Sequence, residues 1–560
     1  MLSVLVLLAV ISCALYGTVA ALSRRFHYDA PETERPIVWV VALFGAAFLV
    51  YLIAIWVAVR AKQDRWLLAA ILVSSLAYRV TLLPSTPIQE IDIYRYLWDG
   101  AVLSVGVSPF RYSPQQVRDA FAEERLEKDL ARLVRLRDSD RSLVTILDRI
   151  HYPQVPTVYP PVSQVVFATA ALTTPDSATV ECRLIVIKVW LVAFDMLTLV
   201  LVVGLLRLTG RPTGLSVVYG WCPLLMKEFA NSGHLDAIAV FLVTLFAYLL
   251  ARLCLSKGRN GTKIAIASGV CLALGVGAKL YPIVLAPLLA VCVARHVGWW
   301  MSAAMMLVFV AIVMVVLWPM APPMLQSDTH QAASAPIEDG GAAIATHADA
   351  GDPSLGLKTF LRRWEMNDFI FLLLIENLKP ADAIPPNQTA WFSVAPESFR
   401  EEVISLVTTG PDGDRWQASF YVARGATALA FLVLAGWFSW RAYPATDTSV
   451  WLRYLFLTLA WFWLLSPTQN PWYWTWVLPL LPFARSRVWL AMSGLVLLYY
   501  LRFWLGYHFS DEPVLGTAYH GTVFFDLVVT WFEYAPWFVC LTVACIWSRW
   551  KRAGQGRGAN

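Results

Sequence analysis

The sequence predicts an all-α, polytopic transmembrane helical bundle. Of its 560 residues, 58% are hydrophobic and only 15% are charged, a balance outside that of soluble domains. The chain also holds about fourteen apolar runs of roughly 15–25 residues, the length that crosses a bilayer as a helix. Its 26 tryptophans and 21 tyrosines suit the aromatic belts of the two membrane interfaces.

The apolar runs divide the chain into five segments. We expect two N-terminal transmembrane helices in 1–65, a transmembrane core in 66–318 that includes an outer loop 84–183, an extracytoplasmic loop 319–415 with a juxtamembrane helix, C-terminal transmembrane helices in 416–548 and a tail 549–560. The expected spans are 2–22, 37–59, 66–83, 184–206, 213–228, 235–253, 264–279, 281–295, 299–318, 416–440, 450–465, 472–484, 488–506 and 523–547.

Lysine and arginine gather on alternate short loops, which predicts the orientation of the chain. If both termini are cytoplasmic, these loops all lie in the cytoplasm. The long insertions 84–183 and 319–415 then lie on the opposite, extracytoplasmic side. Within the first insertion, leucines at helical spacing predict a surface helix over 115–137. The apolar piece 161–172 is too short to cross the membrane and is expected to lie at its surface.

Composition excludes some classes of site. The net charge of +5 is small and no basic tract has a groove-like pattern, so nucleic acid is not an expected partner. The 8 cysteines lie mostly inside apolar runs, without CxxC spacing. They are therefore interpreted as small core residues, and neither a disulfide framework nor a metal site is expected from them.

A cluster of charged and aromatic residues directly follows the third apolar run. It contains Asp92, Tyr94, Arg95 and Asp99. A carboxylate next to the hydrocarbon is costly unless it is paired or used. The cluster is therefore a candidate functional site, although a solvated loop cap with Asp92 paired to Arg95 is the simpler alternative.

Other polar clusters fall on the same predicted side of the membrane. They contribute Arg111 and Tyr159 from the first insertion, and Glu228, His234, Asp236, Lys279, Tyr281, Trp472 and Tyr473 from short connections between spans. Each has a structural alternative, such as a hydrogen-bonded hairpin cap or an interfacial aromatic belt. One histidine with two carboxylates also suits a divalent cation, but the spacing matches no metal signature and no metal ligand is assigned.

Together these side chains suit an anionic lipid headgroup carrying a sugar. Lys279, Arg95 and Arg111 offer cations for a phosphate. The tyrosines and tryptophans can stack on the apolar faces of sugars, and a carboxylate at the bilayer rim can accept a proton from a hydroxyl. There is no glycine-rich phosphate loop of the kind that binds nucleotides.

The order and spacing of these motifs resemble the integral-membrane GT-C glycosyltransferases, and most of all bacterial mannosyltransferase-like enzymes that use polyprenol-phosphate sugars. The resemblance covers roughly residues 66–510. It rests on Asp92-x-Tyr94-Arg95-Tyr96-x-Trp98-Asp99-Gly100, Ser108-Pro109-Phe110-Arg111-Tyr112, Thr157-Val158-Tyr159-Pro160-Pro161, Gly233-His234-x-Asp236, Ala278-Lys279-x-Tyr281-Pro282 and Ser466-Pro467 to Trp472-Tyr473. Similar proteins often have His-Pro before Trp-Tyr, where this chain has Asn470-Pro471.

The resemblance implies a site on the extracytoplasmic side of a bacterial cytoplasmic membrane. The donor would be a polyprenyl-phosphate hexose such as mannose, and the acceptor a glycan, lipid or protein of the cell envelope. The general base would be Asp92, with Asp99 as the second choice. Glu228 or Asp236 would be the second acidic position, and Lys279 with Arg95, Arg111 and Tyr281 would hold the lipid phosphate. No cofactor is assigned, and a divalent cation is left open.

Two other classes of membrane protein also handle lipid-linked saccharides. A transporter or flippase would place its polar residues at mid-depth and would often show repeated halves. A ligase or polymerase would concentrate its charges in a late outer loop. The early clusters favour the glycosyltransferase.

Overall fold

The computed structural model is all-helical over the residues that it describes, which are 1–121, 126–256, 259–321, 365–380, 384–385, 387–407, 415–484 and 486–557. No β-strand occurs among these residues, and the only extended pairings are two isolated bridges. The predicted all-α, polytopic fold class is therefore confirmed. Part of the predicted outer loop 319–415, residues 322–364, lies outside the described residues.

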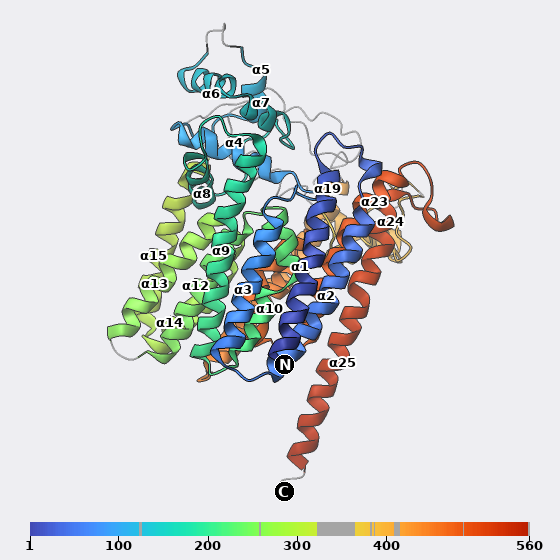
Figure 1. Ribbon diagram of the computed structural model, residues 1–560. Coiled ribbons are helices and arrows are strands. Elements are labelled where there is room, and N and C mark those ends of the chain that lie inside the picture. Colours follow the sequence, from blue (N-terminus) through green and yellow to red (C-terminus); the bar gives the residue numbers. More distant parts are fainter. Residues whose placement is uncertain are drawn as a thin grey trace.

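Eleven helical stretches of the described chain are long and apolar enough to cross a membrane, which makes this an integral membrane protein (Figure 1). They are α1 Leu2–Ser23, α2 Ile37–Arg60, α3 Arg65–Leu82, α9 Val180–Leu208, α12 Asp236–Leu255, α13 Arg259–Ala278, α15 Trp299–Leu317, α19 Arg415–Ala442, α20 Thr448–Leu465, the stretch α22 Val488–Leu495, η10 Val496–Tyr500 and α23 Leu501–His508, and the stretch α24 Gly521–Phe524, η12 Phe525–Val529 and α25 Thr530–Arg557.

Three of the fourteen expected spans are not long continuous helices but successions of short helical pieces. Proline removes a backbone donor and clashes with the preceding turn, so it breaks each of these runs. The pieces are η3 Thr213–Ser216, α10 Val217–Gly220, α11 Pro223–Leu225 and η4 Met226–Asn231; then η5 Tyr281–Leu285 and α14 Ala286–His296; then α21 Pro471–Trp474 and η9 Thr475–Phe483.

The broken helices pack in the middle of the bundle. Helix α12 contacts α9, α13, α14, α20 and η9. Helices α12, α13 and α20 are the most deeply buried spans, whereas α1, α2 and α15 line the periphery. Irregular backbone at membrane depth is tolerated where surrounding protein satisfies its polar groups. The short central pieces meet this condition because the outer spans enclose them.

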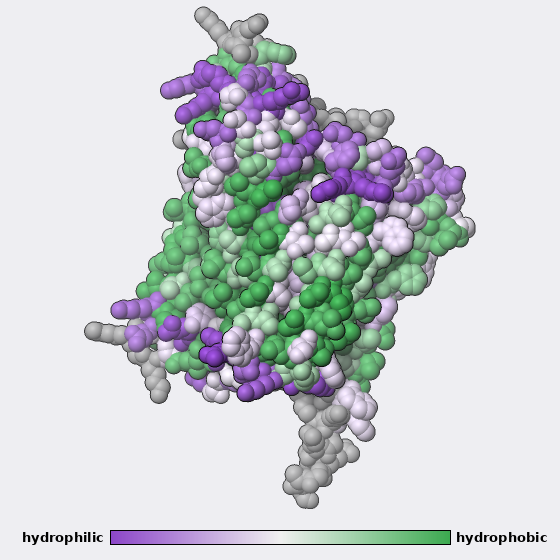
Figure 2. Space-filling view, in the orientation of Figure 1, coloured by the Kyte–Doolittle hydropathy of each residue, from purple (hydrophilic) through white to green (hydrophobic). Residues whose placement is uncertain are grey.

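A layer of short helices covers one end of the bundle, at the top of Figure 1. It consists of α4 Asp92–Ser104, α5 Pro114–Asp119, α6 Lys128–Ser139, α7 Arg141–Asp148 and α8 Pro161–Leu172. The N-terminus and the far end of α25 lie at the opposite end. Figure 2 shows an apolar belt between hydrophilic residues at both ends, as expected of a chain that spans a bilayer.

Two expectations for this layer can be compared with the structure. The single surface helix expected over 115–137 is instead two helices, since α5 starts at a Ser113 capping box and ends at Asp119. Helix α8 has 12 residues, too few to cross the membrane, in line with its expected place at the surface.

The remaining described elements are short. They are η1 Arg24–Phe26, η2 Glu32–Glu34, η6 Trp318–Met320, α17 Ile370–Ile375, α18 Glu397–Ser405 and η11 Val514–Gly516.

Helix α4 is held in place by a close contact with α8. Any side chain at Gly100 would collide with the carbonyl group of Phe167 in α8. Glycine is therefore required here for the two helices to touch backbone to backbone. This contact fixes the position of Asp92, which is the first residue of α4.

Candidate functional site

The first feature of the candidate site is the Asp92 carboxylate. Asp92 lies in the first turn of α4, where the helix dipole favours a negative charge. It is partly exposed, and no residue in the described part of the chain forms a hydrogen bond or ion pair with it. The alternative of an Asp92–Arg95 loop cap is therefore absent from the structure. Asp92 is available to a ligand.

Asp99 has a different environment on the same helix. It is buried, with 2% of its surface exposed. Arg95 Nε lies 3.1 Å from Asp99 Oδ1, and Gln164 Nε2 donates to Asp99 Oδ2 at 3.1 Å. Burial raises the pKa of Asp99, and the Arg95 guanidinium counteracts this shift. Arg95 also donates to the Val155 carbonyl at 2.7 Å, so this pair ties α4 to the segment leading into α8.

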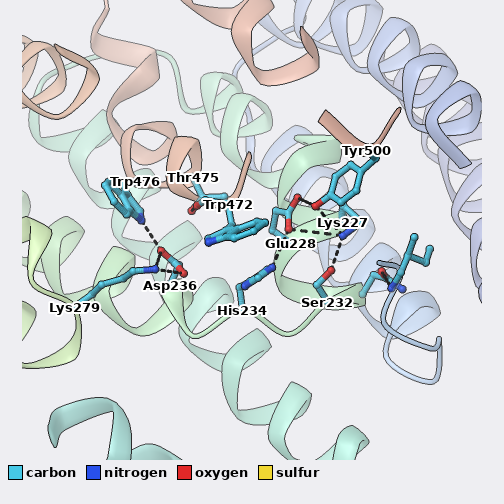
Figure 3. A network of polar contacts seen from close by, with 12 residues as sticks. Lys227, Glu228, Ser232, His234, Asp236, Lys279, Trp472, Thr475, Trp476 and Tyr500 are labelled. Carbon is cyan, nitrogen blue, oxygen red and sulfur yellow. Dashed lines mark hydrogen bonds and ion pairs between the residues drawn. The ribbon is translucent and has the colours of Figure 1, made fainter. Parts of the chain in front are cut away.

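The second feature is an ion pair between Lys279 and Asp236 (Figure 3). Lys279 Nζ lies 2.7 Å from both carboxylate oxygens of Asp236, and Trp476 Nε1 donates to Asp236 Oδ1 at 2.5 Å. The sequence suggested no partner for Lys279, because Asp236 lies 43 positions away. Lys279 Nζ also sits 4.4 Å from the ring centre of Tyr473. Among the described residues its only hydrogen-bond acceptors are the two Asp236 oxygens, which leaves one of its three N–H groups free for a ligand.

The third feature is a buried cluster around Glu228. Tyr500 donates its hydroxyl hydrogen to Glu228 Oε1 at 2.7 Å, and His234 Nε2 lies 3.3 Å from Glu228 Oε2. Lys227 Nζ is 3.8 Å from Glu228 and donates to Ser232 and to the Tyr500 hydroxyl. The π-helical turn η4 brings Lys227 and Glu228 into this cluster, and such turns are frequent at functional sites.

Aromatic rings join the last two features. Trp472 lies flat on His234, with ring centres 4.4 Å apart and planes at 15°. Tyr473 stacks on Trp476 at 4.5 Å, and Tyr281 stacks on the same indole at 3.9 Å. Figure 3 shows Trp472 between the Asp236 pair and the Glu228 cluster. The rings form an apolar wall with charges on both sides, a combination suited to a sugar and its phosphate.

Asp92 acts electrostatically on this wall from α4. Burial raises the pKa of Tyr473, and the negative charges of Asp236 and Asp92 raise it further. Burial lowers the pKa of Lys279, while the same two carboxylates counteract the shift. Burial also raises the pKa of Tyr159, with Asp92 the next cause. The fold therefore brings Asp92 and Lys279 into one electrostatic neighbourhood, although 187 positions separate them.

Two predicted site residues lie away from this network, in the surface layer. Arg111 pairs with Glu127 and Asp129 and keeps 47% of its side chain exposed. The hydroxyl of Tyr94 accepts from Arg149 at 3.3 Å, and its ring is buried. Among the described contacts, neither side chain reaches Lys279, Asp236 or Glu228.

Glu90 belongs to the site although the sequence did not single it out. One of its carboxylate oxygens is buried without a hydrogen-bond partner. Burial raises its pKa well above the usual range; Lys227 opposes the shift, and Asp92 and Glu228 add to it. The preceding Gln89 has a φ of 56°, an uncommon conformation for this residue type that is often found at functional sites. Glu90 therefore interacts electrostatically with both Asp92 and the Glu228 cluster. Its position two residues before Asp92 is the feature of the sequence that could have identified it.

Trp476 and Tyr500 were also missed. Both lie inside apolar, aromatic-rich runs, where nothing local separates a hydrogen-bond donor to a carboxylate from an ordinary core ring. Only the partners brought from α12 and η4 give these two side chains a polar role.

Comparison with known families gives one match. Residues 157–371 match the model of glycosyltransferase family 87, a GT-C-type family of integral-membrane glycosyltransferases. The match confirms the predicted resemblance to the GT-C glycosyltransferases and supports a membrane glycosyltransferase. It covers Tyr159, Glu228, Asp236 and Lys279 but not Asp92. Searches of curated proteins and of solved structures gave no significant match.

Proposed function

We propose that this membrane glycosyltransferase moves a hexose, such as mannose, from a polyprenyl-phosphate donor to a hydroxyl group of a glycan, lipid or protein acceptor, with inversion at the anomeric carbon. The observation that carries the proposal is the Asp92 carboxylate, which has no partner among the described residues and whose charge acts on Lys279 and on Tyr473 of the aromatic wall. A base, a cation and a sugar-binding surface in one place are what such a transfer requires.

In the proposed reaction, Asp92 accepts the proton of the acceptor hydroxyl while its oxygen attacks the anomeric carbon. The bond between that carbon and the phosphate oxygen breaks on the opposite face. Polyprenyl phosphate leaves with the bonding electrons, so the anion needs a cation nearby. The free N–H of Lys279 supplies a charge-assisted hydrogen bond to that anion.

Asp236 has a supporting part in this proposal. Its side chain is 1% exposed and accepts from Lys279 and Trp476, which fixes the ammonium group. The Glu228 cluster lies on the far side of Trp472 from Asp236. Its His234 ring stacks on Trp472 and so holds in place the indole on which the sugar would stack. Asp99 and Arg95 hold α4 in position and are assigned no proton transfer.

The proposed orientation puts the layer α4–α8 outside the cytoplasm and both termini inside it, from the distribution of lysine and arginine on short loops. A flippase is the alternative function. It is less favoured because the charges of the site gather near one end of the bundle, beside α4, instead of following a path through it.

The experiment is turnover of purified protein with a panel of polyprenyl-phosphate sugars, measured as release of polyprenyl phosphate. Asp92→Asn keeps the shape of the side chain and removes its basicity, so turnover should fall about 10²–10⁴-fold with the fold intact. Asp99→Asn is the matched control. It should lower thermal stability through the loss of the Arg95 contact and reduce turnover far less. Normal turnover by Asp92→Asn would refute the assignment of the base.

A further inference from the structure

Three side chains of metal-binding types, two cysteines and one histidine, meet at the end of the bundle away from the candidate site. Cys254 lies in the last turn of α12, and Cys292 and His296 lie in the last two turns of α14. Their ligand atoms all lie within 4.8 Å of one another. In the described part of the chain, this is the one group of three or more His, Cys, Asp or Glu side chains compact enough for a metal ion.

This cluster is separate from the candidate active site. Cys254 follows Asp236 by eighteen positions along the continuous helix α12. At 1.5 Å per residue, the two side chains are about 27 Å apart along the helix. Cys292 and His296 are four positions apart on α14, so they project from the same face.

The distances suit a tetrahedral ion better than a disulfide. The sulfur atoms of Cys254 and Cys292 lie 3.8 Å apart. Two thiolates bound to zinc at about 2.3 Å with a tetrahedral angle would be about 3.8 Å apart. A disulfide needs about 2.05 Å, so the sulfurs would have to approach by nearly half their separation.

The burial of the three side chains also fits a bound ion. Cys292 is fully buried, whereas Cys254 and His296 are partly exposed and leave access from the surface. His296 Nε2 is buried without a hydrogen-bond partner in the structure. Coordination, or a hydrogen bond to a water held by the ion, would satisfy this nitrogen.

We propose that Cys254, Cys292 and His296 bind one thiophilic divalent cation of the zinc type, with water in the fourth position. Two thiolates and an imidazole are a donor set that selects such soft or borderline ions over magnesium and calcium. The ion would join the ends of α12 and α14. The opposite end of α12 carries Asp236, and η5 leads from Lys279 into α14, so the ion would brace the two elements that present the Lys279–Asp236 pair.

Cobalt(II) is the probe, because a tetrahedral cobalt–thiolate site absorbs in the visible and shows sulfur-to-metal charge transfer. The reduced protein should take up one equivalent with both bands. Cys254→Ser and Cys292→Ser should each lose the charge-transfer intensity, and His296→Gln should weaken binding. Cys271→Ser is the matched control, since Cys271 is a buried thiol that donates to the Leu242 carbonyl instead. Wild-type spectra equal to those of the Cys254→Ser/Cys292→Ser double variant would overturn the proposal.

A second measurement needs no variant. Zinc should protect the partly exposed Cys254 of the native protein from alkylation, as mapped by mass spectrometry, and should leave the labelling of Cys182, which is partly exposed and lies outside the cluster, unchanged. Equal alkylation of Cys254 with and without zinc would overturn the proposal. The proposal would also be overturned if Cys254 and Cys292 were found joined in a disulfide and the protein still bound no zinc after that disulfide had been reduced. Neither outcome bears on sugar transfer, so the proposed function stands or falls separately.

Discussion

Replacing Lys279 by alanine separates two roles that the structure gives this residue. The change removes the ion pair with Asp236, in which Nζ lies 2.7 Å from both oxygens and the carboxylate is 1% exposed. Among the described residues, Asp236 then keeps only the Trp476 N–H as a hydrogen-bond donor. Breaking a buried pair from one side costs about 3–5 kcal/mol of the free energy of unfolding. The 18% exposure of Lys279 favours the lower end of that range.

The double variant Asp236→Asn/Lys279→Ala tests whether the loss comes from an unpaired charge. It contains no buried carboxylate at this point, so most of the lost stability should return. Donor binding should not return with it, because the free N–H of Lys279 is missing in both variants. A lost charge-assisted hydrogen bond of about 1.5–3 kcal/mol weakens affinity about ten- to 150-fold.

The assays are chemical unfolding in lipid nanodiscs and titration with a polyprenyl phosphate, both on wild type and the two variants. Wild-type affinity in the folded double variant would show that Lys279 serves only to neutralise Asp236. An unchanged free energy of unfolding in Lys279→Ala would contradict the ion pair itself.

Three further predictions concern other parts of the fold. Gly100→Ala should destabilise the protein by about 1–3 kcal/mol because α4 and α8 must separate, whereas Gly436→Ala, with open space around it, should not; thermal unfolding compares the two. Burial raises the pKa of Glu90, so the folded protein keeps a proton that the unfolded chain releases, and stability falls as pH rises above the usual glutamate range. Glu90→Gln should flatten that fall, measured as the free energy of unfolding against pH above the usual glutamate pKa, and an unchanged slope would remove Glu90 as its source. In intact cells, an impermeant thiol reagent should label Ser139→Cys but not Lys62→Cys, both being exposed positions, and the reverse pattern would invert the proposed topology.

The site residues illustrate how far local sequence can go. Asp92 and Lys279 were predicted as site residues because each lies beside an apolar run. A charge there is energetically unfavourable unless it is paired or used, and its position can be read directly from the sequence. Glu90, Trp476 and Tyr500 were missed because their role depends on partners from distant segments. Arg95 was expected to hold a phosphate, but the structure shows it between Asp99 and the Val155 carbonyl. Its role toward phosphate stays a prediction.

The sequence by itself determined the all-α membrane class and the position of most spans. Apolar runs must be helical in a bilayer, because every backbone group has to be satisfied within the segment. Tertiary structure decided which of those runs are continuous helices. A proline leaves backbone carbonyl groups without their helical hydrogen bonds, and a run can stay broken inside the bundle only where neighbouring helices satisfy those groups. It also decided which charges meet. Lys279 finds Asp236 because α12 and the junction after α13 pack side by side, and Cys254 finds Cys292 for the same reason at the ends of α12 and α14. Contacts between residues about forty positions apart follow from helix packing, which no local pattern encodes.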